Sequence, residues 1–401
     1  MDDRVMNEYI IVLESVAPDS DVFKISGIVD QIEGVDILDT YTTAILGFAA
    51  HIPPAAMMQV LDKLRAEPCY AYIQTNREAE PQTDQFFPPL GLDRIDQPTG
   101  LDQKFTYNQT GKGVDVYVID SGIDTTHSEF DNMRAKPFFT VQPGAVGDCT
   151  GHGTAVAGII GGKNFGVAKE VTLYSVRVAR NPMCKMKDND IIKGINEVMQ
   201  KYQTNGPRAV VNMSIGIRFP ADDAVDDAVS NLIMGTDQIP GVTVVVAAGN
   251  HHQNACFVTP ARVEPAITVA AMSPTSDAEV SASSNFGLCV DLYAPGNLIE
   301  TAKATGLIPL VCNPNPNSPT SVVCMGTSMA APHVAGCAAL YVQTAPTGMG
   351  APADVSAWLK ARAVSGKIVS YDSGTAAPIT SQHPGTPNVL LQCGPYNAGG
   401  Q

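Results

Sequence analysis

The sequence predicts an α/β fold in which a parallel sheet is flanked by helices and preceded by a small α+β domain. After residue 90, valine-rich runs alternate with segments of helical periodicity, as in a parallel sheet covered on both sides. Residues 8–77 follow a different order of elements. Between them, residues 78–89 are rich in Glu, Pro, Gln, Thr and Asp without periodicity, which indicates a linker. We therefore expect domains at 8–77 and 90–393, joined by that linker, and a tail at 394–401.

The front domain has the pattern of a ferredoxin-like fold. Apolar residues recur at helical spacing in two segments, and four Tyr-, Ile- and Val-containing runs read as strands. The resulting order is β-α-β-β-α-β. The expected strands are 8–14, 35–40, 43–52 and 69–74, and the expected helices are 21–32 and 53–67.

The main domain is expected to contain buried parallel strands, because its apolar runs are continuous rather than alternating. These runs lie at 114–119, 171–178, 209–215, 242–248 and 266–270. Active sites in such sheets lie beyond the carboxyl ends of the strands. Asp120 and Asn250 each follow one of these runs, so both are candidates for such a site.

Three motifs carry residues suited to nucleophilic catalysis. Asp120 ends an apolar run, His152 lies between two glycines, and Ser328 lies between a small-residue turn and a predicted helix. Each has a plain structural reading, since Asp favours turns and Ser caps helices. The order Asp, His, Ser is nevertheless that of one type of serine-protease triad, with serine as nucleophile, histidine as base and aspartate orienting it. The three motifs together favour catalysis.

At these motifs the chain resembles the subtilisin-like serine proteases, and it looks most like their proteinase K and aqualysin branch. Further matching stretches are 91–97, 245–250 and 284–296, and the resemblance covers residues 8–392. It implies a subtilisin-like fold for the main domain. It also implies that the front domain is a propeptide, acting as folding chaperone and intramolecular inhibitor, with maturation cleavage within 78–89. Asn250 and the Ser328 backbone N–H would stabilise the oxyanion.

The resemblance further implies a substrate site, at which the segment ending in Ser214, Ile215 and Gly216 pairs with the backbone of a protein or peptide substrate. Small residues would line the specificity pocket, namely Ala247, Ala248 and Gly249. Where relatives usually have a second glycine this chain has Ile217, which puts the width of the pocket in doubt. We expect a self-processed zymogen with broad endopeptidase action.

The remaining expectations concern the disulfide bonds and a metal site. There are nine cysteines, and sequence alone does not choose their pairing. The resemblance implies the pairs Cys149–Cys184 and Cys256–Cys289, and a structural Ca²⁺ held by the carbonyls of Pro265 and Ile267 with the carboxylate of Asp291. Cys312 and Cys324 flank an insertion and could close it as a loop; Cys337, among alanines, reads as a packing residue, and Cys393 is left open.

Composition limits the partners. The net charge of −15 disfavours nucleic acid, and no apolar run is long enough to span a membrane. The first residues lack the features of a signal peptide, yet the cysteines and the resemblance indicate a secreted protein, expected to be a monomer. The alternative function is a catalytically silent subtilase-fold binding protein that retains its propeptide. Transfer to an amine instead of water would use the same residues.

Overall fold

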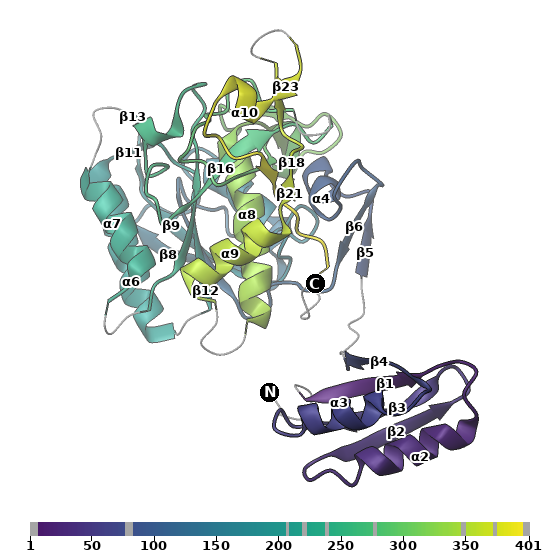
Figure 1. Cartoon of the computed structure of the whole chain (residues 1–401). Helices are drawn as coiled ribbons and strands as arrows, with labels where there is room; N and C mark the ends of the chain where they lie inside the picture. The colour runs from purple at the N-terminus through teal and green to yellow at the C-terminus, as the bar shows by residue number, and fades with distance from the viewer. Residues whose placement is uncertain are drawn as a thin grey trace. The chain divides into compact units, whose positions relative to one another are not determined.

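The computed structural model describes two compact units, which meet in sequence at Pro81 and Gln82. This boundary falls within the expected linker. The structure describes residues 7–76, 83–205, 208–218, 223–236, 240–275, 279–345, 350–371 and 375–395, so the first part of the expected cleavage region (78–82) and most of the expected tail lie outside it. The two units are described separately below (Figure 1).

The front unit is a four-stranded antiparallel sheet with two helices, and it has the predicted order of elements (Figure 1). The strand order β2-β3-β1-β4 places the first and last strands side by side. Apolar residues of the sheet and of both helices form one core, which includes Ile11, Val22, Phe48 and Leu64. The elements are β1 (Glu8–Leu13), α2 (Asp19–Val29), β2 (Asp36–Thr42), β3 (Leu46–His51), α3 (Met57–Arg65) and β4 (Tyr70–Thr75).

The second unit is built on a nine-stranded sheet with the order β21-β24-β17-β16-β14-β12-β7-β9-β8. All its pairs run parallel except β21 with β24, which confirms the predicted α/β class. The strands are β7 (Asp115–Asp120), β8 (Ala135–Thr140), β9 (Thr172–Arg177), β12 (Ala209–Met213), β14 (Thr243–Ala247), β16 (Ile267–Met272), β17 (Leu292–Pro295), β21 (Val364–Ser365) and β24 (Val389–Leu390).

Alternate residues of the central strands enter two different cores. Val116 and Val118 pack with residues of α5 (His152–Gly161) and α8 (Thr327–Thr344). Tyr117 and Ile119 pack instead with residues of α6 (Asp188–Asn205) and α7 (Asp223–Met234). Because the strands are apolar on both faces, helices cover both sides of the sheet, and α8 crosses its centre (Figure 1).

Smaller elements surround the sheet. They are β5 (Thr83–Phe86), α4 (Leu90–Ile95), β6 (Lys104–Tyr107), the 3₁₀ helices Ser128–Met133 and Ala255–Phe257, β10 (Ala179–Arg180), β11 (Lys185–Met186), β13 (Ile217–Arg218), β15 (Val258–Thr259), β18 (Ile299–Ala302), β19 (Cys312–Pro314), β20 (Ser321–Cys324), α9 (Pro352–Arg362), β22 (Val369–Ser370), β23 (Ala377–Pro378) and α10 (Ile379–Gln382).

The strand β5 lies where the sequence predicted an unstructured linker. Residues 83–86 form β5, which pairs antiparallel with β6, and the side chain of Gln85 donates to the backbone oxygen of Asn164. Most of β5 is exposed, so it has no apolar alternation from which a strand could be predicted. The structured part of the second unit therefore begins before residue 90.

Four disulfides join parts of the second unit. Cys149–Cys184 and Cys256–Cys289 are the two pairs that the resemblance implied, and Cys312–Cys324 closes the insertion. The interpretation of Cys337 as a packing residue was wrong, because it is bonded to Cys393. That bridge ties the middle of α8 to the segment that follows β24 (Val389–Leu390). Among the described residues, Cys69 of the front unit is the one free cysteine.

Among the described helices, none has both the length and the apolar character needed to cross a membrane.

Candidate active site

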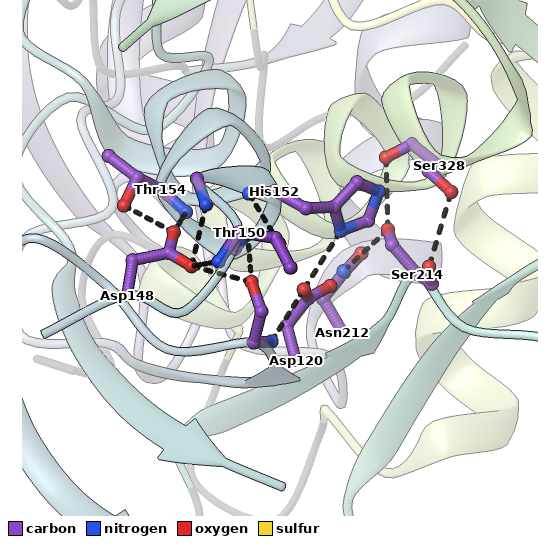
Figure 2. A network of polar contacts seen from close by, with 11 residues as sticks. Asp120, Asp148, Thr150, His152, Thr154, Asn212, Ser214 and Ser328 are labelled. Carbon is purple, nitrogen blue, oxygen red and sulfur yellow. Dashed lines mark hydrogen bonds and ion pairs between the residues drawn. The ribbon is translucent and has the colours of Figure 1, made fainter. Parts of the chain in front are cut away.

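The sheet and two helix starts bring Asp120, His152 and Ser328 to one place. Asp120 is the last residue of β7, His152 the first of α5 and Ser328 the second of α8. Figure 2 shows the imidazole of His152 between Asp120 on one side and Ser328 on the other. The three motifs, more than 200 positions apart at their extremes, thus converge at the carboxyl end of a central strand, as predicted.

Asp120 and His152 form a direct contact. Oδ1 of Asp120 lies 2.8 Å from Nδ1 of His152, and the same oxygen accepts a hydrogen bond from the backbone N–H of Ser121. The Asp120 side chain is fully buried, whereas that of His152 is 18% exposed. Gly153 makes this approach possible, because a Cβ there would lie 2.1 Å from the backbone oxygen of Gly122 and 3.2 Å from Cβ of Asp120.

A second carboxylate, Asp148, holds the start of α5. Its two oxygens accept hydrogen bonds from the backbone N–H groups of Thr150, Gly151 and Thr154 and from two hydroxyls, those of Ser121 and Thr154 (Figure 2). These backbone groups at a helix start have no intrahelical acceptors, so a carboxylate satisfies them well. Asp148 therefore fixes the turn from which His152 projects.

The electrostatic setting raises the pKa of His152 above its ordinary value of 6.5. Burial opposes the charged imidazolium, but the charge of Asp120, its hydrogen bond and the charge of Asp148 together outweigh burial. The ring is thus arranged to take up a proton and to be stabilised once it has done so.

Ser328 is held through a reciprocal pair of bonds with Ser214. The Ser328 hydroxyl donates to the backbone oxygen of Ser214 at 3.1 Å, and the Ser214 hydroxyl donates to the backbone oxygen of Ser328 at 3.0 Å. Asn212, buried in β12, donates its amide to the Ser214 hydroxyl. Ser328 and His152, both described, share no hydrogen bond here. Hydrogen bonds between a nucleophile and its base often tighten only when substrate is bound.

Asn250 lies beside the start of α8 with its amide orientation fixed. Its Oδ1 accepts hydrogen bonds from the backbone N–H of Thr327 at 2.8 Å and from the Thr327 hydroxyl at 3.1 Å. Because a backbone N–H can only donate, the atom facing it must be the oxygen, which leaves the Nδ2 group on the other side. Gly326, at φ +120°, keeps the neighbouring space clear, since a Cβ there would lie 3.1 Å from Nδ2.

A cavity of about 120 Å³ adjoins Ser328 and Asn250. Five of the six residues expected to bind substrate line it: Ser214, Ile215, Gly216, Ala247 and Gly249. Ala248 does not line the cavity, because successive residues of an extended strand point to opposite sides and Ala248 packs in a separate core. Ile217 is absent from the lining as well. It packs against the core beside α6 and α7, so it does not narrow the pocket.

The comparisons with known proteins agree with this geometry. Residues 111–390 match the model of the peptidase S8 group described as the subtilase family. The chain belongs to the subtilase family. It is 43% identical over 319 residues to "Extracellular serine proteinase" of Thermus sp. (strain Rt41A), covering 79% of this chain and 71% of that one. It is 35% identical to "Alkaline serine exoprotease A" of Vibrio alginolyticus, covering 92% of this chain and 66% of that one.

A solved structure supports the same assignment. A cold-adapted subtilisin-like serine proteinase matches with a TM-score of 0.63 at 35% identity, covering 77% of this chain and 98% of the other. The subtilisin-like fold of the main domain is thereby confirmed. As a member of this family of serine endopeptidases, the protein is a serine-type endopeptidase.

The expected calcium site of this subtilase does not fit a cation as it is arranged. Carbonyl and carboxylate oxygens are the donors that Ca²⁺ prefers. However, Oδ1 of Asp291 lies 2.7 Å from Nζ of Lys360, and Oδ2 accepts the backbone N–H of Thr268. Both oxygens are therefore engaged, one of them by a competing positive charge. Among the described residues, no group of three or more His, Cys, Asp or Glu side chains is placed to hold a metal.

Several residues of the subtilase site were missed by sequence reasoning. Asp148 and Thr327 act through hydrogen bonds that involve backbone groups, and no local sequence pattern predicts such bonds. Thr327 directly precedes Ser328, so its position was a signal that could have been used. Arg218 and His251 line the cavity although each is otherwise exposed. The place of Arg218 depends on the pairing between β13 and β15, and the backbone N–H of His251 is held by Oδ1 of Asn285, neither of which sequence alone shows.

Proposed function

We propose that this subtilase hydrolyses peptide bonds through Asp120, His152 and Ser328. Ser328 attacks the carbonyl carbon and passes its proton to Nε2 of neutral His152, which then protonates the leaving amine. The resulting acyl-enzyme is hydrolysed by water, activated by the same imidazole. Asp120 keeps the ring in the tautomer that carries its proton on Nδ1. The observation that carries the proposal is the 2.8 Å contact between Asp120 and His152, with Ser328 on the far side of the ring.

The oxyanion formed during attack is proposed to bind two donors, the Nδ2 group of Asn250 and the backbone N–H of Ser328. The Thr327 bonds that fix the Asn250 amide support this role, because they hold Nδ2 without using it. Such preorganised donors stabilise the transition state more than the ground state. The segment of Ser214, Ile215 and Gly216 is proposed to pair with the substrate backbone, which allows broad action on protein sequences.

The front unit is proposed to be a propeptide that inhibits the enzyme until it is cut away. Its β-α-β-β-α-β order and its own core support an independently folded segment. We further propose that the mature enzyme is secreted and monomeric. Four disulfides in the main unit support an oxidising compartment, as does the name of the Thermus relative. At Asp291, any calcium ion must compete with Lys360.

The test is to express the wild-type chain beside Ser328→Ala. The wild type is expected to cleave itself between about residues 70 and 90, where a surface linker is accessible, and then to digest an unfolded protein. The Ser328→Ala chain is expected to stay full length and inactive. Equal processing of both chains, with Ser328→Ala still digesting protein, would overturn the proposal. The alternative, a silent binding protein, predicts no processing of either chain and no digestion after the front unit is removed with another protease.

A further inference from the structure

The cavity beside Ser328 carries a positive charge in its wall. Arg218 lines it, together with the imidazole of His251 and the apolar side chains of Ile215 and Val258. No Asp or Glu is among the lining residues of the described chain. The lining thus combines apolar side chains with one cation. A pocket that binds only apolar side chains needs no charged group.

The strand pairing explains why Arg218 faces this cavity. Arg218 lies opposite Val258 in the antiparallel pair of β13 and β15, and Val258 itself lines the cavity. Its neighbour Ile217 turns the other way and packs against the core. Because adjacent residues of a strand point to opposite sides, the packing of half-buried Ile217 against that core places Arg218 on the cavity side.

The other charged groups nearby leave Arg218 as the fixed cation. Burial, and then the charge of Arg218, lower the pKa of His251 below its ordinary value, so this imidazole is mainly neutral at pH 7. The carboxylate of Asp226, near β15, is bonded to Arg262 and accepts the hydroxyl of Thr259. That carboxylate is therefore held by another cation.

We propose that Arg218 makes this subtilase prefer an acidic side chain, above all glutamate, on the acyl side of the bond it cuts. The cavity adjoins the nucleophile, so it receives the substrate side chain next to the scissile carbonyl. The methylenes of glutamate would contact Ile215 and Val258 while its carboxylate meets the guanidinium of Arg218. A charge-assisted bond of this kind discriminates against the neutral amide of the same shape. This inference rests on the proposed function and specifies its substrate class.

The experiment compares peptide substrates that differ only at this position, with Glu, Gln, Leu or Lys. Active sites are first counted with a fluorophosphonate probe, so that a poorly folded variant is not mistaken for a selective one. The wild type is expected to favour Glu over Gln by about tenfold in kcat/KM, and the preference should weaken with salt. In Arg218→Gln the Glu/Gln ratio should fall to about one, and Arg218→Glu should shift the preference toward Lys.

Arg208→Gln is the matched control, because this substitution removes the same single positive charge. Arg208 is exposed and precedes β12 at the end away from the cavity. It should keep the wild-type ratio. Equal Glu/Gln ratios in wild type and Arg218→Gln, with Leu cut fastest by both, would overturn the inference while leaving the proposed function intact. Absence of probe labelling and of cleavage of every peptide would instead overturn the proposed function.

Discussion

Oδ1 of Asn250 lies 2.8 Å from the backbone nitrogen of Thr327, the residue before Ser328. This contact determines which end of the amide is available for a substrate oxygen, and it links the loop after β14 to the start of α8. The hydroxyl of Thr327 extends the link, because it also accepts the backbone N–H of Gly249. Donor and nucleophile are thereby positioned by neighbouring residues on one helix start.

Replacement of Asn250 by Ala should lower kcat by about 10²–10³-fold with little change in KM, because the lost bond forms fully only in the transition state. Steady-state kinetics on one peptide substrate measures this. Thr327→Val should lower kcat less, since the backbone N–H still holds the amide, and Thr327→Ser should keep most of the activity. An increase in KM with unchanged kcat for Asn250→Ala would contradict the assigned role.

Activity should rise with pH through the titration of His152, because the protonated ring cannot accept the Ser328 proton. The pKa of His152 lies above its ordinary value of 6.5, so the midpoint of the acid limb of kcat/KM should also lie above 6.5. Asp148→Asn removes one of the charges that raise this pKa and should move the midpoint to lower pH. A midpoint that stays fixed in Asp148→Asn would show that Asp148 acts on structure alone.

The fold of the main unit was largely predictable because its strands are buried on both faces. Runs such as 114–119 and 242–248 are mainly apolar, and their ends agree with those of β7 and β14 to within one residue. The antiparallel pair of β5 and β6 was harder to predict, because Phe105 of β6 enters the core whereas β5 is mostly exposed and is held by its pairing with β6. The same reason hid the direction of Ile217, which is set by β15 some forty residues away.

The candidate site was predictable only in part. Asp120, His152 and Ser328 are recognisable because each sits in a motif with its own turn or helix start. Asp148 is not, because a carboxylate that binds backbone N–H groups looks like any loop aspartate in the sequence. The Cys337–Cys393 bridge was missed for a related reason, since an alanine-rich helix is a common place for a cysteine that only packs.

Loss of the Cys337–Cys393 bridge should lower the free energy of unfolding more than loss of Cys312–Cys324. The chain-entropy model gives about 4 kcal/mol for the separation of 56 residues and about 3 kcal/mol for the separation of 12. Urea unfolding of the two double Cys→Ala variants, made in the Ser328→Ala background to prevent self-digestion, measures the difference. A larger loss for the shorter loop would show that packing, not chain entropy, dominates.

Removal of Lys360 should make the protein more responsive to calcium. In the wild type the ammonium of Lys360 neutralises Asp291, so a cation must displace it. Lys360→Met frees one carboxylate oxygen, and the Tm of this variant should rise with added calcium and fall back with chelator more than that of the wild type. Lys367→Met, an exposed lysine outside this ion pair, is the control. Equal responses in all three proteins would exclude competition at Asp291.

The most direct test of the central claim is covalent labelling of Ser328. The wild type, freed of its front unit, should gain one fluorophosphonate adduct, located on Ser328 by peptide mass spectrometry, and His152→Ala should label at least about a thousandfold more slowly because no base accepts the hydroxyl proton. An adduct on another serine, or equal labelling rates in wild type and His152→Ala, would contradict the account.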